Sequence, residues 1–478
     1  MKMSIFHLCM LLCVAILTGA ATVAEAKPPN IVLILADDLG YGQLGCFGGK
    51  LVATPHLDRL AAEGVKFTQF YAGSTVCAPS RSVLMTGLHT GHTRVRGNAG
   101  ATNRSPQDLR DSDVTMAEVL KQAGYATALI GKWGIGHEGS PGVPTRQGFD
   151  YFYGYLDQVH AHNPYPPFIV RGTERVALRN RTVPGSGGPG EAFGGGVADP
   201  AVDYVPDLMT AEALAWVEQQ KERPFFLYWS LISPHANNEG TKFGRGQEVP
   251  ELGEYAGRDW PMADKGHAAS IARLDADVGR LLARLKQLEL DDNTLVLFSS
   301  DNGPHKEGGN NPALFQPAGP WSGMKRDLTE GGIRVPTVAR WPQGIKPGET
   351  VTTPLWFADL LPTFAELAST TAAVPVDGQS FAKALRGEST AWPKSRTLYW
   401  EFHERGYSQA ALIDGRWKAI RLRHRAAPVQ LFDLHSDPSE SRDLAKGEPA
   451  LVEKARKLFQ SEHRDSEDWP IRETMSGK

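Results

Sequence analysis

The run Asn30-Ile31-Val32-Leu33-Ile34-Leu35-Ala36, followed by Asp37-Asp38, decides the fold of this chain. Its unbroken aliphatic and β-branched residues are typical of a strand buried on both faces of a parallel sheet. Three later segments repeat this pattern of an apolar run that ends in polar residues: 125–130 before Gly131-Lys132-Trp133, 224–232 before Ser233-Pro234-His235, and 294–298 before Ser299-Ser300-Asp301-Asn302-Gly303. We therefore expect four strands whose carboxyl ends meet at the sheet edge where open α/β folds place their sites.

Helical signals separate these strands. Residues 56–63 follow Thr54-Pro55, a cap with proline in the first turn, and residues 115–123 precede Gly124, a C-terminal stop signal. Residues 268–288 carry apolar side chains at helical spacing. This alternation predicts an α/β fold in which helices cover both faces of a large, mostly parallel sheet. Residues 139–200 are rich in Gly, Pro and aromatics and are expected to form long surface loops.

The character of the chain changes after about residue 390. The short runs 397–402, 409–413, 417–422 and 430–434 read as strands, and 450–459 as a closing helix. We expect a main domain over 27–390 and a smaller C-terminal subdomain over 391–478, an antiparallel sheet with a helix.

The first 26 residues have the features of a secretory signal. Lys2 precedes an apolar run over 8–20, and Ala24-Glu25-Ala26 fits cleavage before Lys27. The alternative is an uncleaved membrane anchor. A signal predicts passage through the secretion machinery to the periplasm or the medium. The remaining sequence offers no apolar run long enough for stable membrane insertion.

The composition and net charge of the chain limit the kinds of molecule that it can attract. The 478 residues are 41% hydrophobic and 22% charged, with a formal net charge of −3, so no global field attracts nucleic acid. An anionic substrate must therefore be held by local cations. Two of the four cysteines, Cys9 and Cys13, lie in the signal segment. If Cys77 is chemically modified, Cys46 is the one remaining thiol, and no disulfide within the chain is expected.

The predicted strand ends supply hard oxygen ligands. Asp37, Asp38 and Asp301 carry carboxylates and Asn302 carries an amide oxygen, whereas no Cys/His cluster has zinc spacing. Paired Asp and Asp-Asn-Gly are also common caps and turns. Calcium takes roughly 6–8 oxygens in loose geometry, which these residues suit.

Between these pairs lies Cys77-Ala78-Pro79-Ser80-Arg81, followed by Ser82-Val83-Leu84-Met85-Thr86-Gly87. By itself this could be a buried thiol before a proline turn. The C-x-P-S-R-x-x-x-x-T-G string resembles the signature of the formylglycine-dependent sulfatases, the arylsulfatase-like type I enzymes with an alkaline-phosphatase-like fold. The resemblance extends over nearly all of the chain after the signal segment. It implies that Cys77 is oxidised to formylglycine (3-oxoalanine) by a formylglycine-generating or sulfatase-maturing enzyme.

The resemblance also implies roles for the polar residues at the strand ends. One calcium ion would be bound by Asp37, Asp38, modified Cys77, Asp301 and Asn302. Arg81 matches the arginine that holds the formylglycine hydrate. Lys132 and Lys325 match lysines that contact sulfate, where cations stabilise charge that grows in the transition state. His235 matches the histidine that protonates the leaving oxygen.

One position departs from the family pattern. Many members have histidine where this chain has Gly134, so His137 or His305 could supply the imidazole, or no residue does. On the substrate side, the loop 158–165 contains His162, and the segment 399–405 contains Glu401 and His403 among aromatics. Ordinary loop and strand packing is the alternative for both segments. The whole pattern is closest to the bacterial carbohydrate sulfatases, which implies a sulfated galactose or N-acetylgalactosamine as substrate.

Two other functions stay open at this point. A phosphonate or phosphodiester hydrolase can share the scaffold and the formylglycine motif. A secreted glycan-binding protein without catalysis would result if Cys77 stays a thiol, because a thiol cannot form an aldehyde hydrate.

Overall fold

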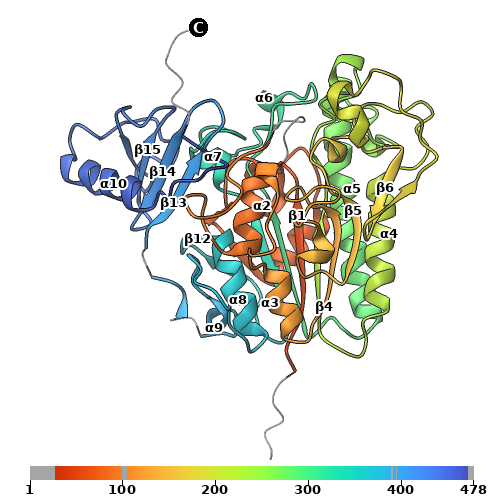
Figure 1. The fold of residues 1–478 in the computed structure, drawn as a ribbon, viewed down its shortest axis with the longest axis horizontal. Coiled ribbons are helices and arrows are strands. Elements are labelled where there is room, and N and C mark those ends of the chain that lie inside the picture. Colours follow the sequence, from red (N-terminus) through yellow and green to blue (C-terminus); the bar gives the residue numbers. More distant parts are fainter. Residues whose placement is uncertain (1–26, 100–104, 389–390, 395, 472–478) are drawn as a thin grey trace, which may run out of the picture.

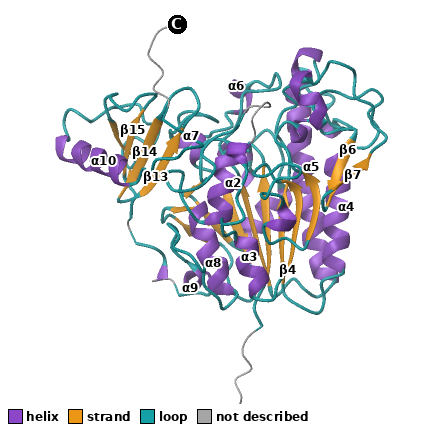
Figure 2. Ribbon diagram, viewed as in Figure 1, coloured by secondary structure: helices purple, strands orange, loops and turns teal. Residues whose placement is uncertain are grey.

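A mixed sheet of ten strands lies between two layers of helices in the computed structural model, which describes residues 27–99, 105–388, 391–394 and 396–471 (Figures 1 and 2). The predicted signal segment lies outside the described residues. None of the helices in the described ranges is both long and apolar enough to cross a membrane.

The strands of the large sheet are, in spatial order, β11 (Glu349–Val351), β2 (Val65–Phe67), β10 (Thr337–Arg340), β9 (Thr294–Ser300), β1 (Asn30–Ala36), β8 (Phe225–Ser230), β4 (Ala126–Lys132), β5 (Tyr151–Tyr155), β6 (Phe168–Arg171) and β7 (Glu174–Ala177). A two-stranded sheet joins β3 (Phe70–Tyr71) to β12 (Leu355–Trp356). The helices are α1 (Pro55–Ala62), α2 (Cys77–Thr86), α3 (Met116–Gln122), α4 (Val205–Glu218), α5 (Met262–Gln287), α6 (Pro312–Phe315), α7 (Glu330–Ile333), α8 (Leu360–Leu367), α9 (Ala382–Leu385) and α10 (Pro449–Ser461).

Strand β1 shows why the sheet needs helices on both faces. All seven of its residues are buried. Ile31, Leu33 and Leu35 join the core cluster that includes residues of α2, α3 and α8. Val32 and Ile34 point the other way, into the cluster that includes residues of α1, α4 and α5. Alternate side chains of one strand thus fill two separate cores, and the predicted α/β fold is confirmed.

The register of the parallel strands brings their carboxyl ends together. Strand β1 pairs in parallel with β8 and β9, and β8 pairs in parallel with β4. Ser230 lies opposite both Leu35 and Gly131, and Ala36 lies opposite Ser300. The polar residues that follow these four strands therefore emerge at the same edge.

The expectation of loops over 139–200 was wrong in part. Strands β5, β6 and β7 lie there and extend the large sheet at one edge. Their signals are weak because β6 and β7 have four residues each and β5 carries a glycine within an aromatic run.

The C-terminal strands form a separate four-stranded antiparallel sheet, as predicted, with α10 beside it (Figure 1). These strands are β13 (Leu398–Phe402), β14 (Ser408–Ile413), β15 (Trp417–Arg421) and β16 (Gln430–Asp433). A fully buried ion pair connects this sheet to the main body, because Lys418 Nζ on β15 donates to Glu330 Oε1 on α7 at 2.8 Å. Burial by itself raises the pKa of Glu330, but the cations Lys418 and Arg334 lower it overall.

Gly131 allows β4 and β8 to approach at the site edge. Its φ is 123°, and a Cβ atom there would lie 1.7 Å from the Ser230 carbonyl oxygen. We expect Gly131→Ala to lower the free energy of unfolding by at least about 3 kcal/mol, because backbone strain and steric overlap add. Gly124→Ala is the matched control, since its φ is 86° and nothing lies within 4 Å of a Cβ there. That variant should lose only about 1 kcal/mol. Equal losses in urea unfolding would contradict the argument.

Candidate active site

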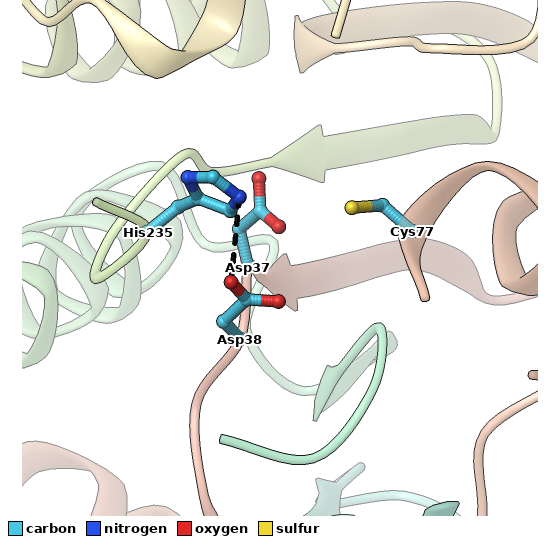
Figure 3. A group of neighbouring side chains, drawn as sticks. All are labelled: Asp37, Asp38, Cys77 and His235. Atoms are coloured by element: carbon cyan, nitrogen blue, oxygen red, sulfur yellow. Dashed lines mark ion pairs between the residues drawn. The ribbon is translucent and has the colours of Figure 1, made fainter. Parts of the chain in front are cut away.

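Cys77 is the first residue of α2 and faces the carboxyl end of β1. Figure 3 shows its sulfur pointing toward the carboxylates of Asp37 and Asp38, with His235 on the far side of them. Ligand atoms of these four residues all lie within 4.8 Å of one another. Asp38 adopts a φ of 64°, a left-handed conformation that non-glycine residues rarely adopt and that is concentrated at functional sites.

Arg81, one turn along α2, binds the ends of three strands. Its guanidinium donates twice to Asp301 Oδ2, from Nη2 at 2.8 Å and from Nε at 3.1 Å. Nη1 donates to the Lys132 carbonyl at 2.8 Å and to Ser230 Oγ at 2.5 Å. Both side chains of the Arg81–Asp301 pair are completely buried. This network fixes α2, and with it Cys77, against the sheet edge.

Two lysines bind the paired aspartates. Lys132 Nζ donates to Asp37 Oδ2 at 2.6 Å, and Lys325 Nζ donates to Asp38 Oδ2 at 2.8 Å. Lys325 Nζ also lies 3.0 Å from His235 Nε2, while His235 Nδ1 lies 2.7 Å from the Ala236 carbonyl. Because a carbonyl can only accept and an ammonium can only donate, these two contacts favour the neutral imidazole with its proton on Nδ1, although Asp38 Oδ2 also lies 3.3 Å from Nε2 (Figure 3).

The oxygen atoms at this edge fit a hard divalent cation. Asp37 Oδ1 and Asn302 Oδ1 are buried and accept no hydrogen bond from any residue in the described ranges. Buried polar atoms nearly always have partners, so two unpartnered oxygens at the ends of neighbouring strands point to a missing positive charge. Asp38 and Asp301 complete a set of oxygen donors that suits calcium. Asn302 Nδ2 donates to Asp38 Oδ1 at 2.6 Å, which joins the two pairs of residues.

Burial and neighbouring charges set the protonation states. Burial raises the pKa of the Cys77 thiol to about 12, although Lys132 and Lys325 pull it down. An unmodified Cys77 is therefore a protonated, weak nucleophile at neutral pH. Burial, followed by the Asp37 carboxylate, raises the pKa of Asp301 to about 7. Burial, together with the ammonium groups of Lys325 and Lys132, holds the pKa of His235 well below its usual value.

Three imidazoles form a row beside the lysines. The His235 ring stacks on His162 at a centroid distance of 4.8 Å and an angle of 9°, and on His305 at 5.9 Å and 26°. His162 Nδ1 lies 3.1 Å from Glu239 Oε2. The structure thus brings two of the predicted substrate-binding histidines, His162 and His305, next to His235.

A side chain at position 134, such as the histidine that many family members carry there, would need a strained backbone and a shift of the Gln158 side chain. Gly134 has a φ of 82°, and a Cβ atom would lie 2.3 Å from Gln158 Nε2. Of the two proposed replacements, His305 lies next to His235, whereas the ring of His137 pairs with Asp108 at 2.6 Å.

Glu401 and His403 lie in a different network. Glu401 is completely buried and accepts from Arg96 Nη1 at 3.0 Å. His403 Nε2 lies 3.0 Å from the same Glu401 oxygen, and the Tyr407 hydroxyl donates to the other oxygen at 2.8 Å. Substrate contact by Glu401, His403 and His137 stays a prediction.

The sequence reasoning missed Glu307, which lies beside Lys325. Its Oε2 accepts from Lys325 Nζ at 3.3 Å, and its Oε1 accepts from Arg326 Nη1 at 2.5 Å. It also missed Ser230, the last residue of β8 and a partner of Arg81. Its position at a strand end was the only available signal for Ser230, and Glu307 had none beyond its nearness to His305.

Comparison with known proteins agrees with this geometry. Residues 29–370 match the family profile described as Sulfatase, and residues 322–463 match that of the N-sulphoglucosamine sulphohydrolase C-terminal region. The chain is 31% identical to the N-acetylgalactosamine-6-O-sulfatase of Bacteroides thetaiotaomicron, over 94% of this chain and 97% of that protein. It is 34% identical to arylsulfatase A of Homo sapiens, over 90% and 86% respectively.

Among solved structures, the chain is similar to Ps i-CgsB in complex with k-i-k-neocarrahexaose. The TM-score is 0.73 at 27% identity, over 94% of this chain and 96% of that one. This agreement extends over the large sheet and the C-terminal sheet together. The chain belongs to the sulfatase family and is a sulfuric ester hydrolase.

Proposed function

We propose that this chain removes sulfate from a sulfated carbohydrate, with a galactose or N-acetylgalactosamine sulfate as the substrate. The observation that carries the proposal is the position of Cys77 at the start of α2, facing buried carboxylates that are themselves matched by buried cations. The choice of sugar is supported by the similarity to a relative named for N-acetylgalactosamine 6-O-sulfate.

Members of the sulfatase family generally use calcium and formylglycine, and this site fits both. Asp37, Asp38, Asp301 and Asn302 would hold the ion, and two of their oxygens have no other partner in the described part of the chain. Formylglycine at position 77, with calcium beside it, would supply an oxygen nucleophile for the sulfur atom, which the Cys77 thiol cannot provide.

The remaining polar residues receive roles from their positions. Arg81 keeps the start of α2 against the sheet and holds Asp301 in place. Lys132 and Lys325 would turn from their carboxylate partners to the sulfate oxygens, where their charge stabilises the transition state. His235, next to Lys325, would deliver a proton to the leaving sugar oxygen, since the negative charge of a bound sulfate raises its pKa.

Export and maturation complete the proposal. Residues 1–26 would direct the chain through the secretion machinery to the periplasm or the medium, and a formylglycine-generating or sulfatase-maturing enzyme would act on Cys77. We place the boundary between the catalytic domain and the C-terminal subdomain near residue 390, before the separate four-stranded sheet.

The chemical state of residue 77 tests the mechanism directly. In protein from its native host, we expect the peptide carrying residue 77 to have the mass of an aldehyde and to react with a hydrazine probe. Cys77→Ala should lower kcat toward a sulfate ester by more than about 10³-fold, as removal of a nucleophile does in other hydrolases. An unmodified thiol in exported, active protein would overturn the mechanism. Faster turnover of phosphonate or phosphate diesters than of sulfate esters would instead favour the phosphonate hydrolase alternative.

Lys325 can be tested against Lys306, a lysine on the segment between β9 and α6. Lys325→Met should lower kcat by about 10²–10³-fold, the effect typical of removing one group that stabilises transition-state charge. Lys306→Met is the control, because Lys306 is exposed and lies outside the site network. Both variants are compared by kcat and KM on one sulfate ester. A similar kcat for the two variants would contradict the role of Lys325.

Calcium binding has a readout that does not depend on activity. Calcium at about 100 times its Kd should raise the free energy of unfolding by about 2.7 kcal/mol relative to chelator-treated protein. Asp37→Ala should abolish this increment, whereas Asp414→Ala, on an exposed turn, should retain it. The measurement is the calcium dependence of Tm for the three proteins. A Tm of the wild type that does not respond to calcium would refute the site.

A further inference from the structure

A cavity of about 280 Å³ opens beside the active site, between the segment that follows Lys325 and the C-terminal sheet. Arg326, Arg405 and Arg423 line it from three different segments. Glu307 links the cavity to the site, because it accepts hydrogen bonds from both Lys325 and Arg326. The cavity wall at Arg326 is therefore one residue away from Lys325 of the active site, with Glu307 bound to both side chains.

All three arginines adopt backbone conformations that are unusual for residues with a Cβ atom. The φ angle is 77° at Arg326, 60° at Arg405 and 66° at Arg423. Glycine or asparagine normally occupies such positions, and strained residues are concentrated at functional sites. Three arginines in this strained conformation around one cavity indicate that their positive charge has a function there, such as binding an anion.

Close packing of two turns brings Arg405 and Arg423 together. The Arg423 N–H donates to Ser408 Oγ at 2.8 Å, and the Tyr407 N–H donates to the Arg423 carbonyl at 3.2 Å. Gly406 makes this approach possible, since a Cβ atom there would lie 2.6 Å from the Arg423 carbonyl oxygen.

The two carboxylates that line the cavity already accept hydrogen bonds, whereas Arg405 and Arg423 have no carboxylate partner in the described part of the chain. Glu404 accepts from the Asn98 N–H at 3.2 Å and lies 3.5 Å from Arg326 Nε. Asp327 Oδ2 accepts from the Met324 N–H at 3.0 Å. The exposed guanidiniums of Arg405 and Arg423 form no ion pair with any residue in the described ranges. Planar guanidiniums match the oxygens of sulfate and carboxylate groups.

We propose that this cavity is a subsite for a second anionic group of the glycan, a sulfate or a carboxylate, bound by Arg405 and Arg423 beside Arg326. The inference rests on the proposed function and narrows its substrate class to carbohydrates that carry more than one negative charge. Arg326 is held by its two glutamates and shapes the wall nearest the active site, while the other two arginines supply the unmatched charge.

The test compares three substrates on the wild type and two variants. The substrates are a monosulfated N-acetylgalactosamine, the same sugar joined to a uronic acid, and the same sugar joined to a second sulfated sugar. The double variant R405Q/R423Q removes the two free cations. The control R425Q removes an exposed arginine two residues after Arg423 that does not line the cavity.

The wild type and R425Q should prefer a substrate with a second anion. R405Q/R423Q should lose about tenfold or more in kcat/KM on that substrate, mainly through KM, and should keep its activity on the monosulfated sugar. The disaccharide that shows the loss identifies the group as carboxylate or sulfate. Equal losses on all three substrates, no loss on any, or no preference in the wild type would overturn the proposal.

Direct binding separates this proposal from the proposed function. Calorimetry on Cys77→Ala protein with the same three saccharides measures affinity without turnover. Weaker binding of the dianionic saccharides after R405Q/R423Q is added to Cys77→Ala supports the subsite whether or not the wild type hydrolyses them. Unchanged binding overturns it. Absence of hydrolysis of any sulfate ester by the matured wild type would count against the proposed function alone.

Discussion

The buried ion pair between Arg81 and Asp301 is the interaction on which the rest of the site depends. Neither side chain has any exposure to solvent, so removing one partner would leave a buried group without its strongest hydrogen bonds, although Asp37 Oδ2 also lies 3.7 Å from Arg81 Nη2. The remaining donors of Arg81 bind the ends of β4 and β8, and Asp301 follows β9. The Arg81 side chain on α2 thus binds groups at the ends of three strands. These contacts hold the start of the helix, and with it Cys77, next to Asp37.

The parts of this arrangement that could be predicted from the sequence are those that depend on long buried strands. The runs that became β1, β4, β8 and β9 are apolar without interruption, and the polar residues after them lie together because parallel strands end at one edge. Strands β5 to β7 gave no such signal, because they are short and β5 is interrupted by a glycine. The row of His162, His235 and His305 could not be predicted either, since it is formed by three segments far apart in the sequence.

The C-terminal sheet contributes to the active site through α7. Glu330 on that helix is buried with Lys418 of β15, and Glu440 also lies 3.7 Å from the lysine. The loop that carries Lys325 and Arg326 leads directly into this helix. A chain that lacked β15 would leave Glu330 with Arg334 alone as its cation partner, so the small sheet stabilises the catalytic loop as well as lining its outer cavity.

The burial of Cys77 also restricts when the protein can become active. The residue is only 3% exposed in the folded chain, where no second enzyme could reach its sulfur. The proposed oxidation must then occur while the start of α2 is still accessible, so that maturation competes with folding. A molecule that folds first keeps a thiol that is both unreactive and inaccessible. The specific activity of a preparation would therefore depend on the fraction of molecules oxidised before they fold, as well as on the turnover of the mature enzyme.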